Sequence, residues 1–330
     1  MNTRRKLVIA LGAGALVAPF ASFAQQQGKV WRVGFLAMSG RPASLESHFL
    51  GAFPQGMREL GYIEGKNLAI EWRFAEDKLD RVQELAAELV QLKMDVIVTS
   101  GSPATSAARK ATTTIPIVMG ITNDPVGVGF VKSLARPGGN ITGLSSLNAD
   151  IAPKLLEMLL SIVPKLSRAG VLVNPANPSH AIYLKNVQAA GQKARVRILP
   201  VEARTLQEIE KAFSILAKEN VEGVILASDL YFRDQRRRIA ELSAKYRLPV
   251  AAGVDEYAEV GGLMSYAQNL PARFRRAAAF VDKIFKGANP GELPVEQPTT
   301  FELVINRKTA KALGITIPQS LLISADKVIE

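Results

Sequence analysis

Residues 95–111 read DVIVTSGSPATSAARKA, an apolar run that leads through a glycine–serine turn into a segment of helical character. The run Asp95–Thr99 predicts a buried strand, because it is short and apolar. Pro103 is favourable at the start of a helix, so a helix over Pro103–Ala111 is expected to follow directly. A strand that runs into a helix in this way is the unit from which parallel α/β sheets are built.

The same alternation extends along the chain and restarts after a turn signal at residues 136–140, which read RPGGN. Further strands are predicted at Trp31–Ala37, Leu68–Phe74, Ile117–Ile121, Ala169–Asn174, Arg197–Val201, Gly223–Ala227, Pro249–Ala252 and Thr299–Ile305, with an extended segment at Gly262–Tyr266. Further helices are predicted at Ser47–Leu60, Leu79–Leu92, Pro125–Leu134, Lys154–Ile162, Pro178–Lys193, Thr205–Lys218, Arg233–Tyr246 and Pro271–Phe285. This pattern predicts two Rossmann-like parallel-sheet α/β lobes, with a ligand cleft outside the carboxyl ends of the strands.

The composition favours a binding protein over an enzyme. The 330 residues exceed the usual size of one compact domain, and 48% apolar residues supply ample core. Cysteine is absent, which excludes disulfides, thiolate nucleophiles and cysteine metal sites. There are only two histidines, His48 and His180, and they lie far apart in sequence, so a multi-histidine metal site is not expected. No cofactor is expected either.

The net charge of +11 does not indicate a nucleic-acid partner. No basic stripe with interleaved aromatic residues is present. The densest basic cluster is Arg233 with Arg236, Arg237 and Arg238, and on a helix its members would point to several faces. We interpret this cluster as a solvated helix surface.

Residues 1–24 have the pattern of a secretion signal. Arg4, Arg5 and Lys6 precede an apolar stretch, and Ser22 and Ala24 supply small residues at the −3 and −1 positions of a cleavage site. The mature chain would begin after Ala24 and reside in the periplasm. The paired arginines leave both the Sec and the twin-arginine export routes open, and an uncleaved anchor helix is the alternative.

No motif specific for catalysis occurs. Gly61 and Gly65 have three residues between them where a phosphate loop has four, and Asn67 follows Lys66 where Ser or Thr is required. The chain contains no nucleophile-elbow pentapeptide.

The turn before Pro103 is the clearest candidate ligand site. Free N–H groups at the start of the helix, the hydroxyls of Ser100 and Ser102, and Gly101 could together hold a carboxylate. The alternative is a plain helix cap by Ser102. Asp124, after the next strand, could cap a helix or pair with a ligand ammonium group.

Motifs along nearly the whole mature chain carry a family resemblance. They are residues 32–36 (RVGFL), 55–62 (QGMRELGY), 64–67 (EGKN), 115–118 (IPIV), 124–125 (DP), 134–143 (LARPGGNITG), 261–266 (GGLMSY), 293–299 (LPVEQPT) and 301–306 (FELVIN). The chain resembles the ABC transporter substrate-binding proteins of the type 1 periplasmic-binding fold, in the branch that includes tryptophan and other aromatic amino-acid binders. It departs from that pattern at Pro54, which should kink or shorten the first helix, and at Ala267, where glycine is usual.

The resemblance implies a receptor that closes on a small ligand and delivers it to an ABC permease in the inner membrane. It implies an amino-terminal lobe of residues 29–146 plus 267–298 and a carboxy-terminal lobe of residues 147–266 plus 299–330. Three crossings would join the lobes near Ser145–Leu147, Ser265–Gln268 and Pro298–Phe301.

We expect the ligand to be an amino acid and favour an aromatic one. We expect the protein to be a monomer and not an enzyme. The alternative functions are a sensory module that serves a receptor kinase and an enzyme on a similar scaffold. The candidate ligand contacts are Met38, Ser39, Ser100, Gly101, Ser102, Thr122, Asn123, Asp124, Asn174, Ser228, Asp229, Tyr231 and Asp255.

Overall fold

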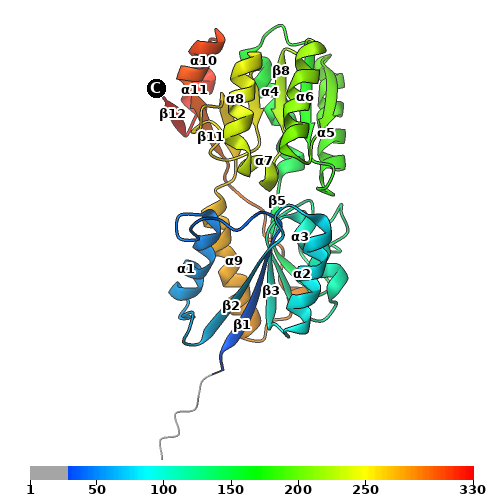
Figure 1. Ribbon diagram of the computed structural model, residues 1–330, viewed down its shortest axis with the longest axis vertical. Coiled ribbons are helices and arrows are strands. Elements are labelled where there is room, and N and C mark those ends of the chain that lie inside the picture. Colours follow the sequence, from blue (N-terminus) through cyan, green and yellow to red (C-terminus); the bar gives the residue numbers. More distant parts are fainter. Residues whose placement is uncertain (1–28) are drawn as a thin grey trace, which may run out of the picture. The chain divides into compact units, whose positions relative to one another are not determined.

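The computed structural model describes residues 29–330, except for the side chains of residues 148–150. The predicted secretion signal therefore lies outside the described residues. Residues 31–330 form one compact unit, which contains two sheets with helices on both faces (Figure 1).

The first sheet has five strands, all parallel, in the order β2-β1-β3-β4-β5. Its strands are β1 (Trp31–Ala37), β2 (Leu68–Phe74), β3 (Val96–Ser100), β4 (Ile117–Asn123) and β5 (Ile141–Ser146). We call this sheet and the helices that cover it lobe 1. Strands β3, β4 and β5 are buried along their whole length, and burial of both faces explains the apolar runs of β3 and β4.

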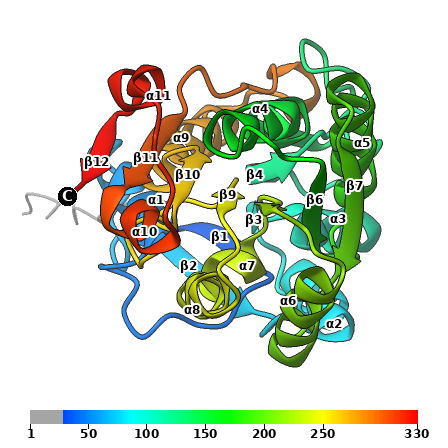
Figure 2. The same cartoon turned by 90° about the horizontal axis from the view of Figure 1, so that it is seen from above.

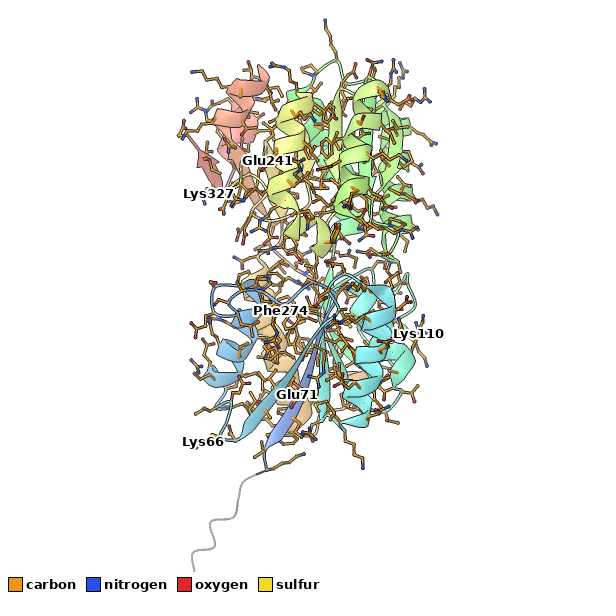
Figure 3. The ribbon with its side chains drawn as sticks, in the orientation of Figure 1. Lys66, Glu71, Lys110, Glu241, Phe274 and Lys327 are labelled. Atoms are coloured by element: carbon orange, nitrogen blue, oxygen red, sulfur yellow. The ribbon has the colours of Figure 1, made fainter. Side chains whose placement is uncertain are left out.

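Helices cover both faces of the first sheet. On one face lie the short helix η1 (Phe49–Gly51), α1 (Ala52–Glu59) and α9 (Leu270–Phe285), and on the other lie α2 (Leu79–Gln91) and α3 (Ser102–Ala111); η2 (Pro290–Glu292) follows α9. Figure 3 labels Phe274 of α9, whose ring lies 5.9 Å from that of Phe35 and 5.3 Å from that of Phe49. This aromatic group joins α9 and η1 to the sheet.

The second sheet has seven strands in the order β12-β11-β10-β9-β8-β6-β7. They are β6 (Arg168–Val173), β7 (Arg197–Glu202), β8 (Gly223–Leu226), β9 (Val250–Ala252), β10 (Met264–Ala267), β11 (Glu302–Asn306) and β12 (Lys327–Ile329). We call this sheet and its helices lobe 2. Its pairs are parallel except for β10 and β11, which run antiparallel.

Helices also cover both faces of the second sheet, as Figure 2 shows. On one face lie α4 (Asn148–Ile162), α5 (His180–Ala194) and α10 (Arg307–Leu313), and on the other lie α6 (Leu206–Lys218), α7 (Leu230–Asp234) and α8 (Arg236–Tyr246); α11 (Gln319–Ser324) precedes β12. Among the described residues, no helix is both long and apolar enough to cross a membrane.

The chain passes between the two sheets three times: after β5, after β10 and before β11. The first and third passages are tied together on the lobe 1 side. The N–H of Ser145 donates to the carbonyl of Glu296 at 2.9 Å, and the N–H of Glu296 donates to the carbonyl of Gly143 at 3.0 Å. In addition, the Thr142 hydroxyl donates to the Leu293 carbonyl at 2.7 Å.

The predicted fold of two α/β lobes is confirmed, and β1 and β2 have the bounds that the sequence predicted. The predicted helix Ser47–Leu60 is shortened to α1 with η1 before it, and Pro54 lies in the first turn of α1, where a missing N–H costs nothing. The predicted helix Arg233–Tyr246 is divided into α7 and α8.

The predicted helix Pro125–Leu134 is wrong. This segment consists of turns, in which the N–H of Val128 bonds to the carbonyl of Asp124 and that of Gly129 to Val126. Gly129 has a φ of +73°, which a helix does not allow. Glycine in a helix interior is unfavourable, so the apolar spacing alone was a misleading signal here.

Candidate functional site

A cavity of about 230 Å³ lies between the two lobes and is lined by both. In each sheet it sits where the strand order reverses: beside β1 and β3 in lobe 1, and beside β6 and β8 in lobe 2. Loops from adjacent strands leave in opposite directions at such a point and open a crevice outside their carboxyl ends. The topology of both sheets therefore determines where the cavity lies.

The lobe 1 wall is built on the turn from β3 into α3. Gly101 has a φ of +96°, a left-handed conformation that favours glycine, and its N–H bonds to the Ile121 carbonyl at 3.1 Å. The first helical bond runs from the Thr105 N–H to the Gly101 carbonyl. The N–H groups of Ser102 and Ala104 lie ahead of it, at the positive end of the helix dipole.

Hydroxyl groups hold this turn from beneath. The Ser102 hydroxyl accepts the Asn123 N–H at 3.1 Å, which ties the start of α3 to the end of β4. The Thr105 hydroxyl lies 2.8 Å from that of Thr99 and 2.9 Å from that of Thr122. These buried contacts fix the turn, so its N–H groups are already oriented before a ligand arrives.

The lobe 2 wall is built around Asp229, whose side chain is only 6% exposed. Its carboxylate accepts hydrogen bonds from the side-chain amides of Asn174 at 3.1 Å and Asn177 at 2.8 Å, and from the Tyr231 N–H at 3.0 Å. All three donors are neutral. Within the described part of the chain, no Lys or Arg forms an ion pair with Asp229. A buried carboxylate therefore faces the cavity without a cationic partner.

His180 clamps the loops that carry this carboxylate. Its Nδ1 accepts the Asn174 N–H at 2.8 Å, so the proton sits on Nε2, which donates to the Ser228 carbonyl at 3.1 Å. Burial lowers the pKa of His180, and the ring is neutral although Asp229 lies 3.9 Å away. His180 thus joins the ends of β6 and β8 without neutralising the carboxylate.

Arg233 is a buried cation of the cavity wall, and its side chain is 5% exposed. Its Nε donates to Asp255 at 2.8 Å and its Nη2 to Glu256 at 2.7 Å. The guanidinium also lies over the ring of Phe49 in lobe 1, 4.4 Å from the centroid. Burial and the Arg233 charge lower the pKa of the neighbouring His48 to about 4, so that ring is neutral as well.

Asp77 brings a carboxylate to the cavity from lobe 1. Its N–H bonds to the Met38 carbonyl at 2.8 Å, which joins the loop after β2 to the loop after β1. Burial, with the negative charges of Asp234 and Asp229 in lobe 2, raises the pKa of Asp77 to about 7. Like charges therefore face each other across the cavity.

Ten of the thirteen predicted contacts line the cavity: Met38, Gly101, Ser102, Thr122, Asn123, Asn174, Ser228, Asp229, Tyr231 and Asp255. Asn174 lies at the wall, but its side-chain NH2 donates to Asp229 and its side-chain Oδ1 accepts the Ala176 N–H at 3.0 Å. The Asn174 side chain therefore holds Asp229 in place.

Three predicted contacts do not line the cavity: Ser39, Ser100 and Asp124. The hydroxyls of Ser39 and Ser100 are buried and have no hydrogen-bond partner among the described residues. Asp124 has a φ of +38°, and its carboxylate accepts the Gly127 N–H at 2.9 Å. It caps a turn, which is one of the two roles that the sequence allows for it, and it does not line the cavity.

Several cavity residues escaped the sequence analysis, chiefly Asp77, Asn177, Arg204 and Arg233. The sequence predicts that Arg233 lies on a solvated helix surface, and this prediction is wrong, because Arg233 is only 4% exposed. Its spacing held a usable signal, because it lies one helical turn after Asp229 and therefore on the same side of α7. Asp77 follows β2 at its carboxyl end, where ligand-facing residues are expected.

Within residues 29–330, no group of three or more His, Asp or Glu side chains is placed to hold a metal ion. The cavity is instead a mixed one, with apolar side chains such as Met38, Ile121 and Val254 beside the ionic groups of lobe 2. Such a lining suits a small organic solute that carries both charge and an apolar part.

Comparisons with known proteins agree with this architecture. A tyrosine-binding protein of Clostridioides difficile (strain R20291) is 27% identical over 264 residues, which cover 80% of this chain and 75% of that protein. A conserved domain protein from Vibrio cholerae is 27% identical with a TM-score of 0.85, and covers 91% of this chain and 100% of its own. An ABC domain in complex with L-Trp from Streptococcus pneumoniae is 26% identical with a TM-score of 0.83, and covers 91% of this chain and 99% of its own.

The family model described as ABC transporter substrate binding protein matches residues 42–329, which span lobe 2 and nearly all of lobe 1 after β1, and which include every residue of the cavity wall except Met38. The fold is that of the type 1 periplasmic binding proteins. The chain belongs to the family of ABC transporter substrate-binding proteins.

Proposed function

We propose that the protein is the extracytoplasmic receptor of an ABC importer, and that it binds an aromatic amino acid in the cavity between its lobes. The observation that carries this proposal is Asp229, a buried carboxylate on the cavity wall whose hydrogen-bond donors are all neutral. Burying an unpaired charge is costly, so a ligand that supplies an ammonium group is favoured there.

The ligand carboxylate would meet the start of α3. The N–H groups of Ser102 and Ala104 and the hydroxyl of Ser102 provide donors, and Gly101 has no side chain to obstruct the approach. A helix N-terminus of this kind is suited to an anion. Arg233 of lobe 2 also lines the cavity, although Asp255 and Glu256 already occupy two of its nitrogens.

The ligand side chain would lie against the apolar part of the wall, to which Met38, Pro103, Ile121, Leu230 and Val254 contribute. The relatives support an aromatic side chain, since one is a tyrosine-binding protein and another was solved with L-Trp. Delivery to a permease and residence outside the inner membrane follow from the proposed role in the importer.

A panel of matched ligands tests the proposal by thermal shift and calorimetry. The panel contains L-tryptophan, L-tyrosine and L-phenylalanine, their deaminated acids, and the amines tryptamine, tyramine and phenethylamine. A ligand present at 100 times its Kd stabilises the native state by about 2.7 kcal/mol, so binding shows directly as a higher Tm. We expect binding only where the ammonium and carboxylate groups occur together. Equal binding of the deaminated acids would refute the role given to Asp229, and no binding by any aromatic amino acid would refute the ligand class.

A further inference from the structure

The contact between Arg233 and Phe49 joins the two lobes. Phe49 belongs to η1 of lobe 1 and Arg233 to α7 of lobe 2, and the guanidinium lies 4.4 Å from the ring centroid. A guanidinium within about 6 Å of an aromatic face is attracted by the ring, and the attraction increases when water is excluded. Both side chains are buried, with Phe49 6% exposed and Arg233 4% exposed.

Each partner is fixed within its own lobe. Asp255 and Glu256 hold two nitrogens of Arg233, and Arg236 reinforces this group through its own ion pair with Glu256 at 2.7 Å. The guanidinium therefore moves with lobe 2. Phe49 packs against the His48 ring at 4.1 Å and the Phe274 ring at 5.3 Å, so it moves with lobe 1. Separation of the lobes must break the contact.

Only one of the two partners lines the cavity. Arg233 is part of the cavity wall, whereas Phe49 lies behind it and does not line the cavity. The neighbouring His48 is neutral, because burial and the Arg233 charge lower its pKa to about 4. Phe49 can therefore influence a bound ligand only through Arg233 and through the position of the lobes.

We propose that Phe49 is a positioning residue that holds Arg233 across the cleft and thereby lengthens the time for which a bound ligand stays in the cavity. The inference rests on the proposed function only in taking this cavity as the ligand site, and it holds for any solute bound there. Because the contact forms as the lobes come together, it should act on ligand release and leave the first encounter nearly unchanged.

The test compares Phe49→Leu with Phe280→Leu. Phe280 is a buried ring of lobe 1 that has its own cation, Lys283, over it at 5.5 Å within the same lobe. Both variants lose a ring of equal size, but only Phe49→Leu loses a contact between the lobes. Stopped-flow fluorescence with the tightest ligand of the panel above should show dissociation about fivefold faster for Phe49→Leu and an association rate within twofold of the parent. Phe280→Leu should leave both rates unchanged.

Phe49→Tyr keeps the aromatic face and should restore dissociation to within twofold of the parent. Circular dichroism confirms that each variant is folded. Dissociation that is equally fast for Phe49→Leu and Phe280→Leu, or a Phe49→Tyr that is no slower than Phe49→Leu, would overturn the inference.

Failure of the proposed function has a different signature. If no amino acid binds the parent protein, the ligand proposal fails, and the dissociation rates are then compared with a solute found by thermal shift among sugars, amides and organic acids. Dissociation of that solute should be faster from Phe49→Leu than from the parent and from Phe280→Leu. Equal dissociation rates for all three proteins would overturn the inference.

Discussion

The two walls of the cavity meet a ligand by different means. Lobe 1 presents the backbone of a strand–helix turn, Gly101 to Pro103, with small hydroxyls beneath it. Lobe 2 presents ionic side chains, Asp229 and Arg233, each of which is held by a network of its own. The first wall follows from a short piece of sequence, whereas the second exists only after distant segments have come together. Recognition by backbone is therefore locally encoded, and recognition by charge is encoded by tertiary structure.

The largest expected effect tests the ionic wall. Asp229→Asn removes the buried charge and turns an amide group towards donors from Asn174 and Asn177. Loss of one partner of a buried charged pair costs about 3–5 kcal/mol, so amino-acid affinity should fall by roughly a hundredfold or more.

Asp124→Asn is the matched control, because Asp124 also follows a strand and accepts a backbone N–H but does not line the cavity. Calorimetry should show unchanged affinity for this variant. A parent-like affinity of Asp229→Asn would remove Asp229 from the ligand site.

The second prediction tests the backbone wall. Gly101→Val places a β-branched residue at a φ of +96°, and its Cβ would lie 3.2 Å from the Leu230 side chain of the opposite lobe. We expect at least tenfold weaker binding, because the side chain blocks the approach to α3 and strains the turn. Gly287→Val provides the control, since Gly287 has a φ of +94° in open space away from the cavity. It should lower Tm and leave the Kd unchanged; a similar loss of affinity in both variants would mean that strain alone weakens binding.

The third prediction concerns one hydroxyl of the same wall. Ser102→Ala removes a donor for the ligand carboxylate and also the acceptor of the Asn123 N–H. Since a charge-assisted hydrogen bond contributes about 1.5–3 kcal/mol, the Kd should rise roughly tenfold. Ser106→Ala, one turn later on α3 and outside the cavity wall, should bind as the parent does in the same calorimetric titration. If Ser102→Ala keeps the parent affinity, the N–H groups hold the carboxylate without this hydroxyl.

The smallest expected effect concerns the charges that face each other across the cleft. The pKa of Asp77 is raised to about 7 in the folded protein, from a usual value near 4, by burial and by Asp234 and Asp229. Between these two pH values the folded state holds a proton that the unfolded state has released. The stability of the ligand-free protein should therefore fall as pH rises through this window.

Asp77→Asn should remove part of this slope and become more stable than the parent near pH 7.5, while the two proteins converge at pH 4. Urea unfolding at four pH values measures the difference between them. The difference isolates Asp77 from Asp234, whose pKa is also raised, to about 6, mainly by burial. Parallel pH profiles for both proteins would show that the cleft charges do not interact as the structure indicates.

The fold could be predicted because its signals are local. The continuous apolar runs of β1, β3 and β4 and the helical spacing of α2 each lie within one segment, and together they imply parallel sheets. Segments without such a signal are not predicted: β5 reads ITGLSS, and the elements at the carboxyl end, α10, α11 and β12, are too short to show a clear period. The apolar spacing of Pro125–Leu134 predicts a helix, but Asp124 and Gly129 have positive φ values and the segment forms turns.

Site residues could be predicted where their position shortly after a strand is enough to place them at the cavity. Gly101 and Ser102 lie within two residues of the end of β3 and Asp229 within three of the end of β8, and all three line the cavity. Arg233 could not be assigned from composition, because its burial depends on Asp255, Glu256 and Phe49, which lie 22, 23 and 184 positions away in the chain. Its partners decide whether an arginine of a basic cluster faces water or a ligand.

The hydrogen bonds between the first and third passages have a mechanical consequence. Ser145 and Glu296 bond to one another where both segments leave lobe 1, so these two connections form a single ribbon and cannot slide independently. A ribbon of two paired strands flexes across its flat face far more readily than it shears along its length. The lobes should therefore open by rotation about a single hinge axis along these two passages. A solute would enter and leave on the side of the cleft opposite this axis.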